Sequence, residues 1–188
     1  RYWANIGVGG FSNGVVFTSS GSFIVPSTGK FKVTVVGGGN AGGSQSGNRG
    51  GSGGKAGATA VQWFTGLTPG NTCTVTIGAG GTTSSGGTTS FSGSGFTTVS
   101  AAQSTPTTGA LNIEGGNGNI GMFGSSDPNV QLGGQGGSST MGNGGSGAFQ
   151  DGIATDAGNG TGYGGGGGGE VGSANKGTGS QGIVVVEY

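Results

Sequence analysis

Apolar and polar residues alternate in several short segments of the chain, which is the pattern of β-strands that bury one face. Residues 31–36 alternate phenylalanine and valine with lysine and threonine, and residues 72–77 alternate as cleanly. Residues 182–188 are apolar on both faces, which is typical of a central strand. In the second segment the positions expected to face inward are Cys73, Val75 and Ile77.

The other strand-like runs are short, and none of them has a helical pattern. They lie at 15–19, 22–25, 58–64, 88–91, 96–100 and 110–113. No window of ten or more residues carries apolar residues at the i, i+3, i+4 spacing of a helix, and glycine, a poor helix former, interrupts every window. The sequence therefore predicts an all-β fold, built on a small β-sandwich scaffold.

Glycine occupies 54 of the 188 positions and is concentrated between the strand-like runs, at 37–57, 114–147 and 157–181. Disorder is one interpretation, because glycine loses more conformational freedom on folding than any other residue. The clustering of apolar residues and the low net charge favour a folded chain instead. We therefore expect long glycine-rich loops that project from the sandwich, and binding sites commonly lie on such loops.

Some glycines recur at every third position, as at 115, 118, 121 and 124. A period of three matches the extended left-handed helix with three residues per turn. The glycine segments are thus candidates for ordered, polyglycine II-like structure. Chance spacing in a glycine-rich chain is the alternative.

Composition argues against several functions. Charged residues make up 6% of the chain and sum to zero, so there is no basic stripe for nucleic acid. No apolar run is long enough to cross a membrane, and the single cysteine, Cys73, cannot form an internal disulfide. The chain has no histidine, which removes the commonest general base and metal ligand. We expect no cofactor, no metal site and no enzymatic activity.

Three local patterns hint at chemistry, and each has a simpler interpretation. Gly37, Gly39 and Gly42 have dinucleotide-binding spacing after a strand, but no helix can follow to hold the phosphates. Asp151 and Asp156 are close in sequence, yet no apolar pocket surrounds them as a glycosidase would need. The threonines at 72, 74 and 76 form a row like those of ice-binding surfaces, although threonine is also common on the polar face of ordinary strands.

The glycine segments also contain isolated large side chains that resemble the aromatic contacts of antibody loops. Such side chains either bind a ligand or anchor their loops in the scaffold. We expect at least two to be exposed at the tip of the molecule, with Phe123 and Tyr163 as the first choices. The candidate receptor-binding residues are Met122, Phe123, Asp127, Met141, Phe149 and Tyr163.

The order of several motifs resembles the glycine-rich C-terminal domain of bacteriophage tail fibres of the phage Mu type. The similarity covers about residues 15–99 and 160–188, whereas residues 100–159 follow no pattern of that family, so no receptor contact is carried over there. The matching segments are VFTSSGSF at 16–23, VP at 25–26, KVTVVGGG at 32–39, GAGG at 78–81, GGTTSF at 86–91 and GIVVVEY at 182–188.

This resemblance implies a position at the distal end of a virion tail fibre. Residues 1–14 would then be a lead-in from the fibre shaft and residues 15–188 the receptor-binding tip domain. The resemblance further implies a homotrimer, a fibre-assembly chaperone, and a host receptor that is either lipopolysaccharide or an outer-membrane protein.

Three hypotheses of function follow. The first is an adhesin that binds a host bacterial surface receptor, a cell-surface glycan or an outer-membrane protein, without catalysis. The second is a structural or extracellular glycine-rich protein, including an ice-binding one. The third is a depolymerase tailspike, against which the absence of histidine and of paired acids argues.

Overall fold

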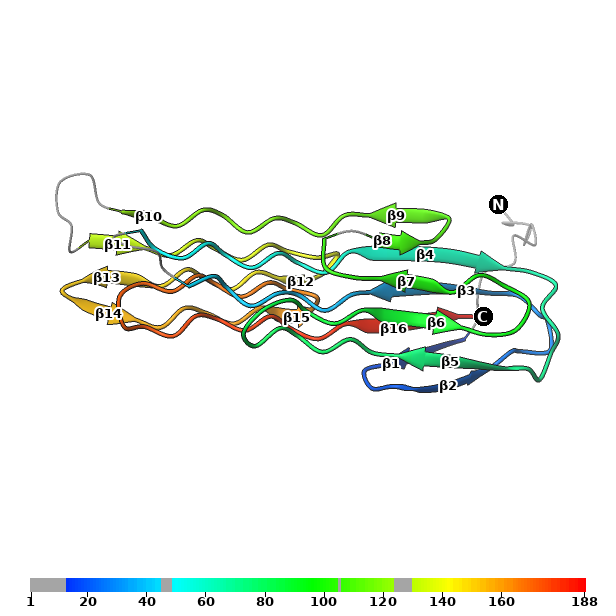
Figure 1. Cartoon of the computed structure of the whole chain (residues 1–188). Coiled ribbons are helices and arrows are strands. Elements are labelled where there is room, and N and C mark those ends of the chain that lie inside the picture. The colour runs from blue at the N-terminus through cyan, green and yellow to red at the C-terminus, as the bar shows by residue number, and fades with distance from the viewer. Residues whose placement is uncertain (1–12, 45–48, 105, 124–129) are drawn as a thin grey trace, which may run out of the picture.

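The computed structural model describes residues 13–44, 49–104, 106–123 and 130–188. Within these residues the chain forms strands and extended segments and no helix, which confirms the predicted all-β fold. Figure 1 shows an elongated molecule with a β-sandwich at one end and a bundle of long, wavy segments that runs to the other end. The backbone amides of Asn13 and Tyr188 each donate to the other's carbonyl, at 2.8 and 2.9 Å, so both lie in the sandwich.

Two five-stranded antiparallel sheets form the sandwich. The first contains, in spatial order, β1 (Gly14–Phe17), β16 (Ile183–Glu187), β3 (Phe31–Val36), β4 (Thr59–Phe64) and β9 (Leu111–Ile113). The second contains β2 (Gly21–Ile24), β5 (Thr72–Thr76), β6 (Thr89–Ser92), β7 (Val99–Ala101) and β8 (Pro106–Thr108). The last strand of the chain, β16, lies between β1 and β3, as predicted for a central strand.

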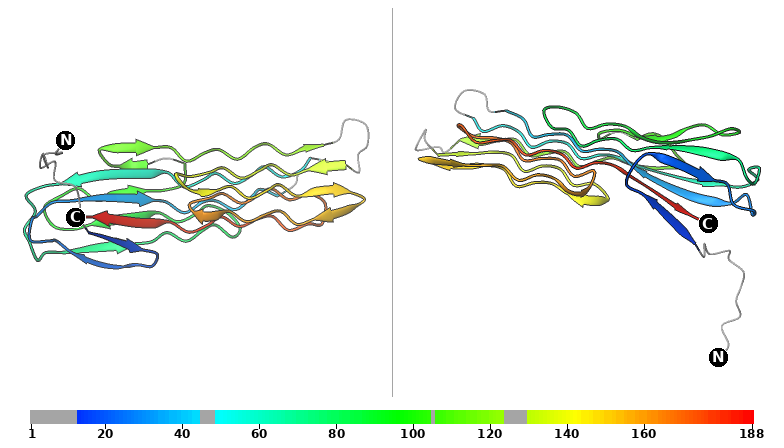
Figure 2. Two further views of the ribbon diagram at one scale, coloured as in Figure 1. Left: turned by 180° about the vertical axis from the view of Figure 1, so that it is seen from behind. Right: turned by 90° about the horizontal axis from the view of Figure 1, so that it is seen from below.

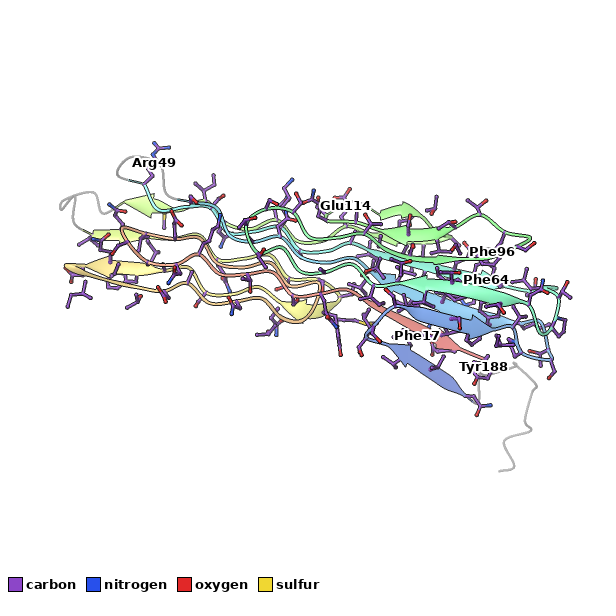
Figure 3. The ribbon with its side chains drawn as sticks, turned by 60° about the horizontal axis from the view of Figure 1, so that its bottom comes forward. Phe17, Arg49, Phe64, Phe96, Glu114 and Tyr188 are labelled. Atoms are coloured by element: carbon purple, nitrogen blue, oxygen red, sulfur yellow. The ribbon has the colours of Figure 1, made fainter. Side chains whose placement is uncertain are left out.

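Aromatic rings fill the space between the two sheets. The Phe31 side chain is fully buried and packs against Phe23, Phe64 and Phe91, with ring centroids 5.0 to 5.8 Å apart. Cys73 and Val75 of β5 face this core as predicted, while Thr72, Thr74 and Thr76 of the same strand are exposed. Figure 3 shows Phe64 and Phe96 at the sandwich end and Arg49 at the far end.

The glycine segments are not projecting loops but hydrogen-bonded parts of the bundle, which is a correction to the expectation from sequence. Gly134 and Gly137 donate their amides to the carbonyls of Gly51 and Gly54, at 2.8 and 2.9 Å. The residues just before these two donate to a second neighbouring segment, and the residues just after them accept from a third. Hydrogen bonds that change partner with a period of three define a helix with three residues per turn and no internal bonds.

Close backbone contact explains why the bundle is so rich in glycine. A Cβ atom added at Gly134 would overlap the carbonyl oxygen of Asn119, and one added at Gly137 would overlap that of Gly116. Neither glycine has a positive φ, in keeping with the left-handed three-residue helix. The same holds for Gly115, Gly118 and Gly121 of the spacing found in the sequence, where an added Cβ would overlap a backbone carbonyl oxygen of the neighbouring segment, while Gly124 lies outside the described residues. Figure 2 shows these segments running side by side along the bundle.

Six short strands interrupt the glycine segments. β12 (Met141–Asn143) pairs with β15 (Thr161–Tyr163) near the sandwich. The other four form a small sheet at the far end of the bundle (Figure 1), in the order β10 (Met122–Phe123), β11 (Val130–Leu132), β13 (Phe149–Asp151) and β14 (Ile153–Thr155). We call this four-stranded sheet the tip sheet.

Candidate functional site

Strand register in the tip sheet brings large apolar side chains from different glycine segments into line. Met122 lies opposite Leu132, and Leu132 lies opposite Phe149. Residues that are directly opposite in an antiparallel pair have side chains on the same face. The three side chains therefore form one row across three strands, which continues to Thr155 on the fourth.

This row lies on an exposed face of the tip sheet. Met122 is 60% exposed, Leu132 42% and Phe149 44%. Ile153, in the next row on the same face, is 84% exposed. Side chains of this size are normally buried. Four of them together on one small sheet therefore form an exposed apolar patch rather than scattered surface residues. We call these four residues, Met122, Leu132, Phe149 and Ile153, the tip face.

The opposite face of the tip sheet packs on the bundle and fixes the orientation of the exposed face. Gln131 is 8% exposed and lies opposite Gln150, whose side-chain amide covers Gly172. Ala154, next in this row, packs against a small cluster that contains the fully buried Val171. The Oε1 atoms of both glutamines are buried and accept no hydrogen bond within the described residues.

A shallow cavity of about 380 Å³ adjoins the tip face. Its apolar wall consists of Ile120, Met122 and Leu132, and glycine backbone forms much of the rest. Two amide side chains and one hydroxyl, from Asn119, Gln135 and Ser146, complete the lining. An apolar wall beside a few neutral hydrogen-bonding groups suits a sugar, which presents both C–H faces and hydroxyls.

The structure places five of the six candidate residues, in two regions. Met122 and Phe149 lie on the tip face. Phe123 is in β10 and pairs with Gln131, while Asp127 lies outside the described residues. Met141 and Tyr163 lie opposite each other in β12 and β15.

Met141 and Tyr163 belong to the junction between bundle and sandwich, not to the tip. The β12–β15 pair contacts the sandwich through Thr140, whose hydroxyl hydrogen-bonds the Thr59 hydroxyl at 2.6 Å. Ser139 also donates its hydroxyl to the Tyr163 carbonyl. Tyr163 is only partly exposed, so the prediction that it lies exposed at the tip is wrong.

Leu132, Ile153 and the polar lining of the cavity were not among the candidates from sequence. Leu132 could have been found, because Val130, Gln131 and Leu132 alternate in the manner of a strand. Ile153 follows Gly152, whose φ of 78° allows the tight turn between β13 and β14. No sequence signal distinguishes Asn119, Gln135 or Ser146 from other polar residues of the bundle.

Asp156, which follows β14, is hydrogen-bonded to another segment of the bundle. Asp156 accepts hydrogen bonds from the backbone amide and side-chain amide of Asn175, at 2.8 and 3.2 to 3.3 Å. These bonds, the backbone one above all, lower the pKa of the Asp156 carboxyl from its ordinary value. The carboxylate thus joins two bundle segments, and Asp151 is exposed at the end of β13.

Neither a metal site nor a membrane span is found in the described part of the chain. No three acidic, cysteine or histidine side chains in it come together in a way that would hold a metal ion. No helix there is long and apolar enough to cross a membrane.

The outer face of the second sheet is rich in hydroxyl groups. Two rows of hydroxyl side chains cross this sheet from the threonines of β5. In the first row, Thr74 lies opposite Ser22 on β2 and Ser92 on β6. In the second row, Thr76 lies opposite Ser90 on β6, and the row continues to Ser100 on β7 and Thr108 on β8. The row noticed in the sequence is therefore one line of a wider hydroxyl face.

A second apolar surface covers the outer face of the first sheet. Trp63 is 48% exposed, Val16 57% and Leu111 47%. The Lys32 Nζ and Glu187 Oε2 atoms form an ion pair of 2.5 Å on the same face. This surface lies at the sandwich end, far from the tip face (Figure 1).

No protein-family model and no curated protein matches this chain.

Proposed function

We propose that this protein is an adhesin at the tip of a bacteriophage tail fibre, and that its tip face binds a receptor on the surface of the host bacterium. One observation carries the proposal: four large apolar side chains are exposed together at the end of the molecule opposite the sandwich. A fibre joined near Asn13 or Tyr188 would hold the sandwich and leave the tip sheet free to meet a cell surface.

The chemistry of the tip favours a glycan as receptor. Phe149 and Met122 offer apolar surface for the C–H face of a sugar ring, and Asn119, Gln135 and Ser146 offer hydrogen bonds to its hydroxyls. The chain's near-zero charge suits such neutral recognition. The hydrogen-bonded glycine bundle would hold these groups in place before binding, which reduces the entropy lost on association.

The apolar outer face of the first sheet gives the proposed homotrimer a surface on which subunits could pack. Trp63 and Leu111 would then be covered by a neighbouring subunit. A fibre-assembly chaperone would act before that face is covered.

Binding to whole host cells tests the proposal. The variant Ile153→Ser/Phe149→Ser should lose saturable binding, because two of the four apolar side chains of the tip face are removed. Ile24→Ser is the matched control, since Ile24 is also an exposed strand isoleucine, 55% accessible, but lies on the sandwich. Equal binding by both variants, each with an unchanged melting temperature, would reject the tip face as the receptor site.

Ice binding is a second candidate function, favoured by the hydroxyl face of the second sheet. Its rows of serine and threonine on adjacent strands offer a broader plane than one threonine row. An ice-recrystallisation assay with the Thr74→Tyr variant separates the candidates, because this substitution disrupts the plane and leaves the tip face intact. Inhibition of recrystallisation that Thr74→Tyr abolishes would favour ice binding over adhesion.

A further inference from the structure

A second cavity, of about 400 Å³, lies on the side of the bundle. The connection between β5 and β6 extends along the bundle and back (Figure 1), and residues 83–85 at its turn form one wall. Residues 40–44 and 52–55 form the floor, and Lys176 closes the remaining side. None of these residues belongs to the tip sheet.

The charge of this cavity is unusual for this chain. The whole protein has six basic and six acidic residues, yet the lining contains two lysines, Lys55 and Lys176, and no carboxylate. By contrast, Lys32 on the sandwich is neutralised by Glu187 at 2.5 Å. Two lysines that line one cavity without an acid favour an anionic ligand there, because a counter-charge between them relieves the repulsion of their like charges.

A hydrogen bond to the backbone holds the Lys176 side chain at the cavity. Its Nζ donates a hydrogen bond to the Thr83 carbonyl at 3.1 Å, and its side chain is only partly exposed. An ammonium group has three donors. After the bond to Thr83 two remain for a ligand.

Neutral donors surround the two lysines. The Gly86 amide donates to Asn40 Oδ1 at 2.9 Å, which fixes the Asn40 side chain with its NH₂ group as the remaining donor. The exposed hydroxyls of Ser52, Ser84 and Ser85 also line the cavity. No hydrogen bond joins these three hydroxyls to the described residues, so they are available to a ligand.

We propose that this cavity binds a phosphate group. Two lysines match the charge of a phosphate monoester better than that of a single carboxylate, and the amide and hydroxyl donors suit its several acceptor oxygens. The phosphate could belong to a soluble sugar phosphate or to a phosphorylated glycolipid. The proposal does not depend on the tip face, from which the cavity is separate.

Calorimetric titration of the full chain with glucose 6-phosphate tests the proposal, with glucose and gluconate as comparison ligands. Saturable binding of glucose 6-phosphate alone is expected. Lys176→Gln should weaken it by about tenfold or more, because charge-assisted hydrogen bonds are lost, and Lys176→Arg should retain most of it. Lys30→Gln, which removes an exposed lysine outside the cavity, is the matched control.

Native lipopolysaccharide and lipopolysaccharide stripped of phosphate distinguish the two sources. Binding of the native form alone, weakened by Lys176→Gln, identifies a glycolipid phosphate. Binding of glucose 6-phosphate without any preference between the two lipopolysaccharides identifies a soluble phosphate. The proposal is overturned if no phosphate probe binds saturably, if gluconate binds as tightly as glucose 6-phosphate, or if Lys30→Gln weakens binding as much as Lys176→Gln.

Discussion

Replacing one buried glycine of the bundle by alanine should destabilise the whole protein, and Gly54 is a suitable position. Its amide donates to the Gly167 carbonyl at 2.7 Å. A Cβ atom there would lie 2.5 Å from the carbonyl oxygen of Ala41 and 2.8 Å from its carbonyl carbon. Real Cβ contacts are essentially never shorter than 3.0 Å, so the neighbouring backbone must shift by about half an ångström.

The magnitude follows from three contributions to the free energy of unfolding. Forcing the segments apart costs about 1–3 kcal/mol, and weakening one backbone hydrogen bond costs about 1 kcal/mol. Alanine restricts the unfolded chain more than glycine, which offsets about 0.5–1 kcal/mol. The net loss is about 1–3.5 kcal/mol, which corresponds to a fall in melting temperature of roughly 2–14 °C for a chain of this size.

Thermal unfolding followed by circular dichroism or calorimetry measures this loss. Ser52→Ala is the control, because Ser52 lies in the same segment but is exposed, and surface changes of this kind stay within about 0.5 kcal/mol. If the two variants melt at the same temperature, the glycine segments are not packed backbone to backbone, and the close-packing explanation for their composition is refuted.

Three further predictions concern the sandwich core, the cysteine and the bundle. Phe91→Ala should lower the free energy of unfolding by about 3–5 kcal/mol, because Phe91 is fully buried among aromatic rings. Denaturant titration measures this loss, and a loss below about 1 kcal/mol would contradict that packing. Cys73, 1% exposed and with its thiol pKa raised by burial, should react with a thiol reagent only after unfolding, and rapid reaction in the native protein would place it elsewhere. The pKa of Asp156 is lowered in the folded protein, so its stabilising effect is present above the unfolded pKa and is lost as pH falls through the folded value. The Asn175 amide signal in NMR should therefore titrate at a pH below the ordinary range of an aspartate, and Asp156→Asn should abolish that step.

The sandwich could be predicted because its signal is local. The alternation in 31–36 and 72–77 matches β3 and β5 almost to the residue, and the apolar run at 182–188 is the central strand β16. In these segments side-chain burial decides the structure, and burial is visible as a period of two in the sequence.

Only the three-residue period of the bundle could be predicted from the sequence. The period of three suggested polyglycine II-like structure, but the same composition also suggested loops, because glycine has no side chain whose burial could be read from the sequence. What orders the segments is hydrogen bonding between backbones distant in the chain, such as Gly54 with Gly167.

The tip sheet was the least predictable part. Its strands have two or three residues, and their pairing depends on the register that the bundle imposes. Met122 and Phe149 were found as isolated apolar residues, whereas Leu132 and Ile153 were missed and Tyr163 lies at the junction instead.

Blocking the tip face at a single site is the most direct test of its proposed role. Because Cys73 is buried, a cysteine introduced by Ile153→Cys would be the reactive thiol and could be labelled with a bulky maleimide polymer; Ile24→Cys gives the same label on the sandwich. Binding to host cells should be abolished by the label at position 153 and preserved with the label at position 24. Full binding with position 153 labelled would contradict the proposal that the tip face meets the receptor.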